Sequence, residues 1–205
     1  MSDPVYEAVS KAKRQAESGN PEGAVATLEA YLETDPHCIK PRLELARIAY
    51  GMGDREYGDL QMDAVLDLEP DNLEALKASI TVLSRDKKTR ALADERYRRV
   101  LELEPGPEIH NEYARFLRNQ FLDFERSAEY YELAVAAAPD RYEYHQNYAV
   151  LLLLDLKDYI KARRELEAVL RLNPEHASAR KNLDLLMRKK FDAQGNLKKR
   201  FLRKR

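Results

Sequence analysis

The chain has 205 residues, of which 44% are hydrophobic and 35% are charged, with seven glycines and nine prolines. This composition is typical of long amphipathic helices and excludes collagen-like and low-complexity chains. The single cysteine excludes an internal disulfide framework, and the longest apolar run, Ala149–Leu154, is far shorter than the roughly 20 residues that span a bilayer.

The first residues, Met1-Ser2-Asp3-Pro4, lack the basic and apolar segments of a secretory signal. We therefore expect a cytoplasmic protein, or a nuclear one if the source is a eukaryote.

The net charge of −1 conceals an uneven distribution of charge along the chain. Residues 188–205 carry +8 and residues 1–187 carry −9, so the sequence predicts an acidic body followed by a basic tail.

A phrase ending in proline recurs along the chain at intervals of 34 or 35 residues, which indicates an internal repeat. Val65-Leu-Asp-Leu-Glu-Pro70 and Val100-Leu-Glu-Leu-Glu-Pro105 are two copies of it. A proline lacks the amide hydrogen and disfavours helix at the residue before it, so each phrase marks a helix end. The five phrases end at Pro36, Pro70, Pro105, Pro139 and Pro174.

Each repeat is expected to hold two helices joined by a short turn. In the first repeat these are residues 4–18 and 21–34, separated by Gly19-Asn20-Pro21, where glycine suits a left-handed helix end and Asn-Pro suits a helix start. The later repeats break near 51–54, 85–88, 122–123 and 155–158. The predicted repeat boundaries are 4–36, 37–70, 71–105, 106–139 and 140–174, followed by a capping helix within 175–190.

The spacing of apolar residues supports antiparallel helix pairs. His110-x-x-Tyr113-Ala114-x-x-Leu117 returns 35 residues later as His145-x-x-Tyr148-Ala149-x-x-Leu152, and these positions share one helix face. The second helix of each repeat has a small residue near its start, which allows two helices to approach closely. These small residues are Ala24, Gly58, Ala93, Ala128 and Ala162.

This pattern resembles the tetratricopeptide repeat (TPR) family. The segments 127–139 and 162–174 match its second helix best, with the small residue, the aromatic or leucine and the terminal proline. The resemblance implies an all-α, right-handed superhelical solenoid of about five repeats plus a capping helix over residues 1–187. Residues 191–205 are expected to form a flexible basic tail.

The resemblance also implies a concave groove, lined by the first helix of each repeat, that binds a segment of a partner protein. The position expected to face inward holds Lys13, Arg47, Thr81 and Arg115, each 34 residues from the next. We predict that this ladder of cations prefers an acidic segment. The predicted groove residues are Lys13, Lys40, Arg47, Tyr50, Lys77, Asn111, Arg115, Arg118, Gln146 and Asn147.

Two alternatives to an acidic preference stay open. Glu44, Glu74, Glu112 and Glu143 also lie on first helices and could neutralise the ladder. The charged residues could equally form ordinary surface pairs on solvated helices.

No catalytic, cofactor or metal site is predicted. The sequence has no phosphate-binding glycine loop, nucleophile elbow or dinucleotide motif. His110 and His145 occupy the same repeat position, which favours packing over metal binding, and Cys38 has no second metal-ligand pair. We expect a non-catalytic scaffold or adaptor.

The basic tail supports a second hypothesis, a nucleic-acid-associated or ribosome-associated protein that docks through phosphate contacts. Nucleic acid or an acidic protein are the expected ligands, and the tail could also stay solvated or fold back on the acidic body. Membrane binding is not expected, because few apolar side chains accompany the cations. Weak self-association through an exposed solenoid end is a further alternative. The candidate polyanion contacts are Lys198, Lys199, Arg200, Arg203, Lys204 and Arg205.

Overall fold

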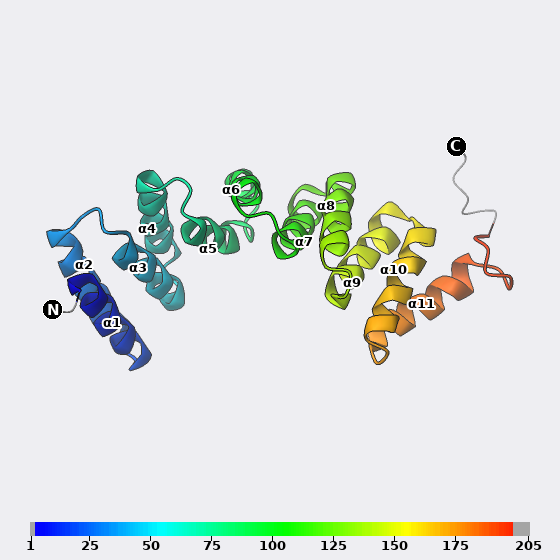
Figure 1. The fold of residues 1–205 in the computed structure, drawn as a ribbon, viewed down its shortest axis with the longest axis horizontal. Coiled ribbons are helices and arrows are strands. Elements are labelled where there is room, and N and C mark those ends of the chain that lie inside the picture. Colours follow the sequence, from blue (N-terminus) through cyan, green and yellow to red (C-terminus); the bar gives the residue numbers. More distant parts are fainter. Residues whose placement is uncertain (1–2, 199–205) are drawn as a thin grey trace. The chain divides into compact units, whose positions relative to one another are not determined.

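The computed structural model describes residues 3–198, and in this range the chain folds into consecutive helices with short connections (Figure 1). The same range contains no β-strand, only an isolated antiparallel bridge between Phe191 and Leu197. The all-α expectation is confirmed. None of the helices in the described part is both long and apolar enough to cross a membrane.

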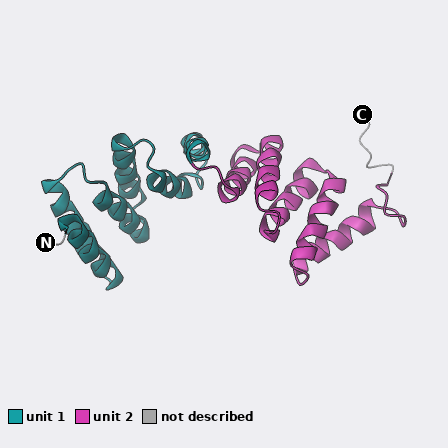
Figure 2. Cartoon of the chain, in the orientation of Figure 1, with its two compact units in different colours: residues 1–103 teal, residues 104–205 magenta. Residues whose placement is uncertain are grey.

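The chain divides into two compact units, residues 1–103 and 104–205 (Figure 2). Unit 1 contains three helix pairs, and within each pair the two helices pack against each other. The first helix of the second pair, α3, also packs on both helices of the first pair. The pairs are α1 (Pro4–Glu17) with α2 (Pro21–Thr34), α3 (Ile39–Met52) with α4 (Arg55–Leu68), and α5 (Leu73–Leu83) with α6 (Arg90–Leu103).

Unit 2 contains two helix pairs and a final single helix. The first helix of each pair ends in a wider π-helical turn, η1 or η2. The final helix packs on the second helix of the last pair. The elements are α7 (Pro107–Phe116), η1 (Leu117–Phe121) and α8 (Phe124–Ala137), then α9 (Tyr142–Leu151), η2 (Leu152–Leu156) and α10 (Tyr159–Leu172), then α11 (Ala177–Lys190).

Short polar residues start most of the helices. The side chain of Asn20 accepts a hydrogen bond from the amide of Gly23, and Asp54, Asn72, Asp123 and Asp158 cap α4, α5, α8 and α10 in the same way. Each cap satisfies an amide that has no partner inside its helix, and losing one typically costs about 1 kcal/mol.

The prolines that end the repeated phrases impose extended backbone on the residues before them. Asp35, Glu69, Ala138 and Asn173 have φ between −140° and −133° and ψ between 74° and 86°. This conformation is the one that a following proline favours, and it ends α2, α4, α8 and α10. The local sequence therefore sets the end of these four second helices.

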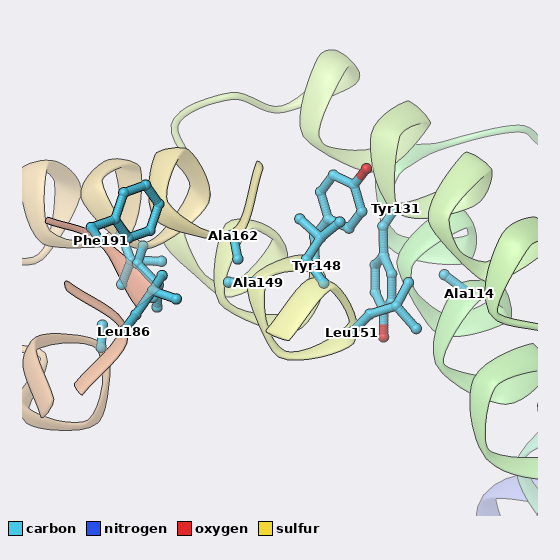
Figure 3. Close-up of a cluster of buried hydrophobic side chains, with 12 residues drawn as sticks. Ala114, Tyr131, Tyr148, Ala149, Leu151, Ala162, Leu186 and Phe191 are labelled. Atoms are coloured by element: carbon cyan, nitrogen blue, oxygen red, sulfur yellow. The ribbon is translucent and has the colours of Figure 1, made fainter. Parts of the chain in front are cut away.

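Buried side chains gather where successive helices meet inside each unit. In unit 1 one such cluster joins Leu28 of α2 to Leu45 and Ile48 of α3, and burying side chains of this size stabilises the fold by about 1.5–3 kcal/mol each. In unit 2 the cluster runs from Ala114 through Tyr131 and Tyr148 to Leu186 and Phe191 (Figure 3). Each unit therefore has its own hydrophobic core.

The chain stays folded beyond the end of α11. Residues 191–198, which we call the C-terminal hook, turn back at Gly195, whose φ is 79°. Phe191 is only 5% exposed, Leu197 packs on the core of unit 2, and the amide of Lys198 donates to the carbonyl of Lys190 at 2.8 Å. The described part of the segment 191–205 is thus folded against α10 and α11.

Candidate partner-binding residues

The ten predicted groove residues all lie on the first helices of their pairs or on the π-helical turn that extends one of them. Five belong to each unit. In unit 1 they are Lys13 on α1, Lys40, Arg47 and Tyr50 on α3, and Lys77 on α5. In unit 2 they are Asn111 and Arg115 on α7, Arg118 on η1, and Gln146 and Asn147 on α9.

In unit 1 a single carboxylate neutralises two cations of the predicted ladder. Glu44 is 6% exposed, and one of its oxygens lies 3.8 Å from Nζ of Lys13. Its other oxygen accepts a hydrogen bond from Nε of Arg47 at 3.0 Å and forms an ion pair with the same guanidinium. A buried carboxylate needs such compensation, so Lys13 and Arg47 serve the fold.

The other three predicted residues of unit 1 differ in exposure. Lys40 and Lys77 are exposed. Tyr50 is half-buried, and its ring lies directly over Gly58 of α4, in the space that a side chain there would fill. Its hydroxyl donates a hydrogen bond to Asp59 at 2.9 Å. Tyr50 therefore packs between the two helices of its own pair.

In unit 2 three of the five predicted residues form hydrogen bonds across two helix pairs. Nδ2 of Asn147 on α9 donates to Oδ1 of Asn111 on α7 at 2.9 Å. Nε of Arg118 donates to Asp155 on η2 at 2.6 Å. We call Asn111, Arg115, Arg118, Asn147 and Asp155 the unit 2 cluster.

Arg115 differs from the other cations of the predicted ladder. Its side chain is exposed, and no carboxylate among residues 3–198 lies within ion-pair distance of it. The positive charges of Arg118 and Arg115 lower the pKa of the buried hydroxyl of Tyr131. Burial has the larger effect and raises this pKa to about 12. Arg115 therefore presents an unneutralised cation on α7, one helical turn after Asn111.

Gln146 also lies on α9 but is not part of the cluster. It is half-buried, and its side-chain oxygen is buried and accepts no hydrogen bond from any residue in the described range. A buried acceptor without a donor costs about 1–3 kcal/mol.

Of the predicted tail residues only Lys198 lies within the described part of the chain. Its ammonium group donates to the carbonyl of Arg188 at 2.9 Å, so it caps the end of α11. Lys199, Arg200, Arg203, Lys204 and Arg205 lie outside the described residues.

The two histidines of the repeated motif have structural neighbours. His145 is buried, with Nδ1 2.6 Å from Glu165 on α10 and Nε2 3.0 Å from the carbonyl of Pro139. His110 lies against the ring of Tyr130 at a centroid distance of 6.0 Å. Among residues 3–198 no group of three or more His, Cys, Asp or Glu is placed to hold a metal ion.

The sequence did not indicate two partners of the site. Asp155, which pairs with Arg118, and Tyr131, which lies near both arginines, were not among the predicted residues. The pairing of Glu44 with Lys13 and Arg47 is one of the alternatives that the sequence left open. Residue spacing held part of the signal, because Glu44 precedes Arg47 by three positions on one helix.

Comparison with solved structures identifies the fold. MamA from Desulfovibrio magneticus RS-1 is 20% identical, with a TM-score of 0.72 over 86% of this chain and 98% of that one. Pseudomonas aeruginosa PilF is 18% identical, with a TM-score of 0.68 over 90% of this chain and 83% of its own.

YrrB, described as a TPR protein with an unusual peptide-binding site, is 16% identical, with a TM-score of 0.70 over 89% of this chain and 99% of its own. No protein-family model matches the sequence, and no curated protein matches it either. The chain has the fold of the tetratricopeptide repeat proteins.

Proposed function

We propose that the chain is a non-catalytic interaction scaffold that binds a segment of a partner protein on the first helices of its repeats. The fold supports this proposal, and so does its likeness to YrrB, which has a peptide-binding site. We further propose that the segment is acidic and that the unit 2 cluster supplies the selectivity.

The observation that carries the acidic preference is the unequal neutralisation of the cations. Lys13 and Arg47 share the carboxylate of Glu44, and Arg118 is paired with Asp155. The N–H groups of the Arg115 guanidinium remain available as donors to a ligand. A guanidinium can bind a carboxylate through two parallel hydrogen bonds, which gives geometric selectivity as well as affinity.

The neighbouring amides add a second kind of contact. Asn111 and Asn147 use one donor and one acceptor on each other, which leaves other amide positions for the backbone of an extended segment. An acidic side chain on Arg115 and a backbone contact on the asparagines would together define both sequence and orientation.

The test compares the affinity of the full chain for acidic, neutral and basic peptides of equal length. We expect the acidic peptide to bind most tightly, and Arg115→Ala to weaken it about tenfold, since hydrogen bonds to charged groups contribute about 1.5–3 kcal/mol. Arg164→Ala is the matched control, because Arg164 is an exposed arginine on α10, a second helix. Equal affinity for the three peptides would refute the acidic preference.

A further inference from the structure

The π-helical turns that extend α7 and α9 expose three large apolar side chains. Leu122, which ends η1, is 66% exposed, Leu154 of η2 is 57% exposed, and Phe121 of η1 is 38% exposed. Single exposed leucines are ordinary on a protein surface, but apolar side chains that gather at one place mark an interaction surface.

An ion pair holds the two turns together. Nε of Arg118 on η1 donates to Asp155 on η2 at 2.6 Å. Leu154 immediately precedes Asp155, and Phe121 and Leu122 follow Arg118 by three and four positions. The three apolar residues therefore lie at the same end of the two helices, close to two members of the unit 2 cluster. We call Phe121, Leu122 and Leu154 the apolar patch.

The fold does not require the two leucines of the apolar patch. The repeats of unit 2 are offset by 35 residues, so Leu122 corresponds to Lys157 and Leu154 corresponds to Asn119. Both of these counterparts are exposed polar residues. Each leucine thus occupies a position at which the other repeat has a polar side chain in contact with solvent.

The backbone of Leu122 is also strained. Its φ is 56° and its ψ is 27°, in the left-handed region where a side chain crowds the backbone and glycine does not. In unit 1 the residue just before the start of α2 or α4 has the same conformation and is glycine, at Gly19 and Gly53. A leucine that is both strained and exposed lowers stability without serving the fold, and such residues are concentrated at functional sites.

We infer that the apolar patch receives an apolar side chain of the same partner segment whose acidic residue binds Arg115. The inference rests on the proposed function, because the patch adjoins the unit 2 cluster. Leu122 follows Arg115 by seven positions, which is about 10 Å at about 1.5 Å per helical residue. An extended segment advances about 3.3 Å per residue, so the apolar residue lies about three positions from the acidic one.

The size of the apolar patch favours a side chain of such a segment over a second copy of the chain. A stable protein–protein interface buries about 800 Å² on each partner, which is more than three side chains supply. A segment that the unit 2 cluster already holds needs only a small additional contact, because most of the entropy of association is lost at the first contact.

The experiment measures the affinity of the full chain for four labelled acidic peptides of equal length and charge by fluorescence anisotropy. One leucine lies three positions after the acidic residue, three positions before it or next to it, and the fourth peptide has serine instead. We expect one of the two three-residue spacings to bind about tenfold more tightly than the serine peptide, since burying much of a leucine side chain has an effect of about this size. The adjacent leucine should give no gain.

Leu122→Asn with Leu154→Asn tests the apolar patch at unchanged net charge, and asparagine tolerates the left-handed conformation better than leucine does. This variant should lose the gain from leucine and keep its affinity for the serine peptide within about twofold. The matched control is Leu133→Asn with Leu172→Asn, two exposed leucines on α8 and α10, and it should retain the gain. Circular dichroism shows that both variants are folded.

The outcomes distinguish the inference from the proposed function. Equal affinity for the leucine and serine peptides, with both still weakened by Arg115→Ala, overturns the apolar contact and leaves the acidic preference intact. A gain from leucine that persists in Leu122→Asn with Leu154→Asn also overturns it. A wild-type dimer that this variant dissociates, in sedimentation without peptide, would assign the patch to a second copy instead. If Arg115→Ala changes the affinity for no peptide, the proposed function fails and the inference fails with it.

Discussion

At the scale of single residues, one repeat position holds two histidines with opposite environments. Position 145 faces Glu165, and the equivalent position 110 faces Tyr130, which replaces the glutamate in the repeat register. The hydrogen bond with Glu165 raises the pKa of His145 above its ordinary value, although burial opposes this. Burial lowers the pKa of His110. The same packing position therefore favours a charged imidazole in one repeat and a neutral one in the other.

These two shifts predict opposite effects of pH on stability. Since the folded pKa of His145 is raised, its contribution is fully present below the unfolded pKa of about 6.5 and is lost as pH rises through the folded value. We expect His145→Gln to lower the free energy of unfolding by about 1–3 kcal/mol at pH 6, and by less at pH 9. Urea unfolding at both pH values measures this.

His110→Gln is the internal comparison. Because the folded pKa of His110 is lowered, its contribution is present above pH 6.5 and is lost as pH falls below that value. NMR titration of the two imidazoles should place His145 above His110. The reverse order would contradict the assignment.

Glu44 offers a second prediction at this scale. Replacing it by glutamine keeps its shape but removes the charge that holds Lys13 and Arg47. We expect Glu44→Gln to leave the affinity for an acidic peptide within about twofold, because the proposed selectivity comes from the unit 2 cluster. Titration of the acidic peptide into both forms measures the change. A several-fold gain of affinity in a folded variant would show that Lys13 and Arg47 also face the ligand.

At the scale of the elements, the close approach of α3 and α4 depends on a glycine. A Cβ atom at Gly58 would overlap the ring of Tyr50, whereas a Cβ atom at Gly51 would meet no atom within 4 Å. Both glycines lie inside helices. Alanine substitutions at the two glycines therefore distinguish the effect of overpacking from the effect of helix propensity.

We expect Gly58→Ala to destabilise the protein by about 1–3 kcal/mol, because Tyr50 must move and its hydrogen bond to Asp59 is disturbed. Gly51→Ala should stabilise it by about 0.5–1 kcal/mol, because alanine loses less backbone entropy in a helix. Chemical denaturation of the two variants decides the point. Equal effects would mean that the helices can separate at no cost.

The sequence predicted the helices well because their ends are set locally. Asn20, Asp54 and the phrase-ending prolines act within a few residues of the boundary that they determine. The C-terminal hook escaped prediction because it depends on Phe191 reaching the unit 2 core and on a contact with Leu197 six positions later. Likewise, the register located Arg115, but only side-chain geometry shows that Arg115 is unpaired while Arg47 is not.

At the scale of the whole molecule, each unit contains buried clusters of its own. The buried clusters around Leu28 and Met62 lie wholly within residues 1–103, and the cluster from Ala114 to Phe191 lies wholly within 104–205. Because helical repeats are stabilised mainly by nearest neighbours, each unit should be able to fold by itself.

We therefore expect the fragments 1–103 and 104–205, produced separately, each to be helical and to melt cooperatively. Circular dichroism with a thermal ramp measures both properties. A fragment that is unfolded at 25 °C would show that its core is insufficient without the rest of the chain.

The Asn111–Asn147 hydrogen bond has a thermodynamic consequence. It joins α7 and α9, the two helices that a segment bound to the unit 2 cluster would touch. A partner that contacts both asparagines without displacing this bond binds only where the two repeats are stacked. By mass action, it then protects the stacked form by RT ln(1 + [L]/Kd), about 2.7 kcal/mol at a hundredfold excess over Kd. Occupancy would thus appear as slower amide hydrogen exchange across α7 and α9, with α1 and α2 unchanged.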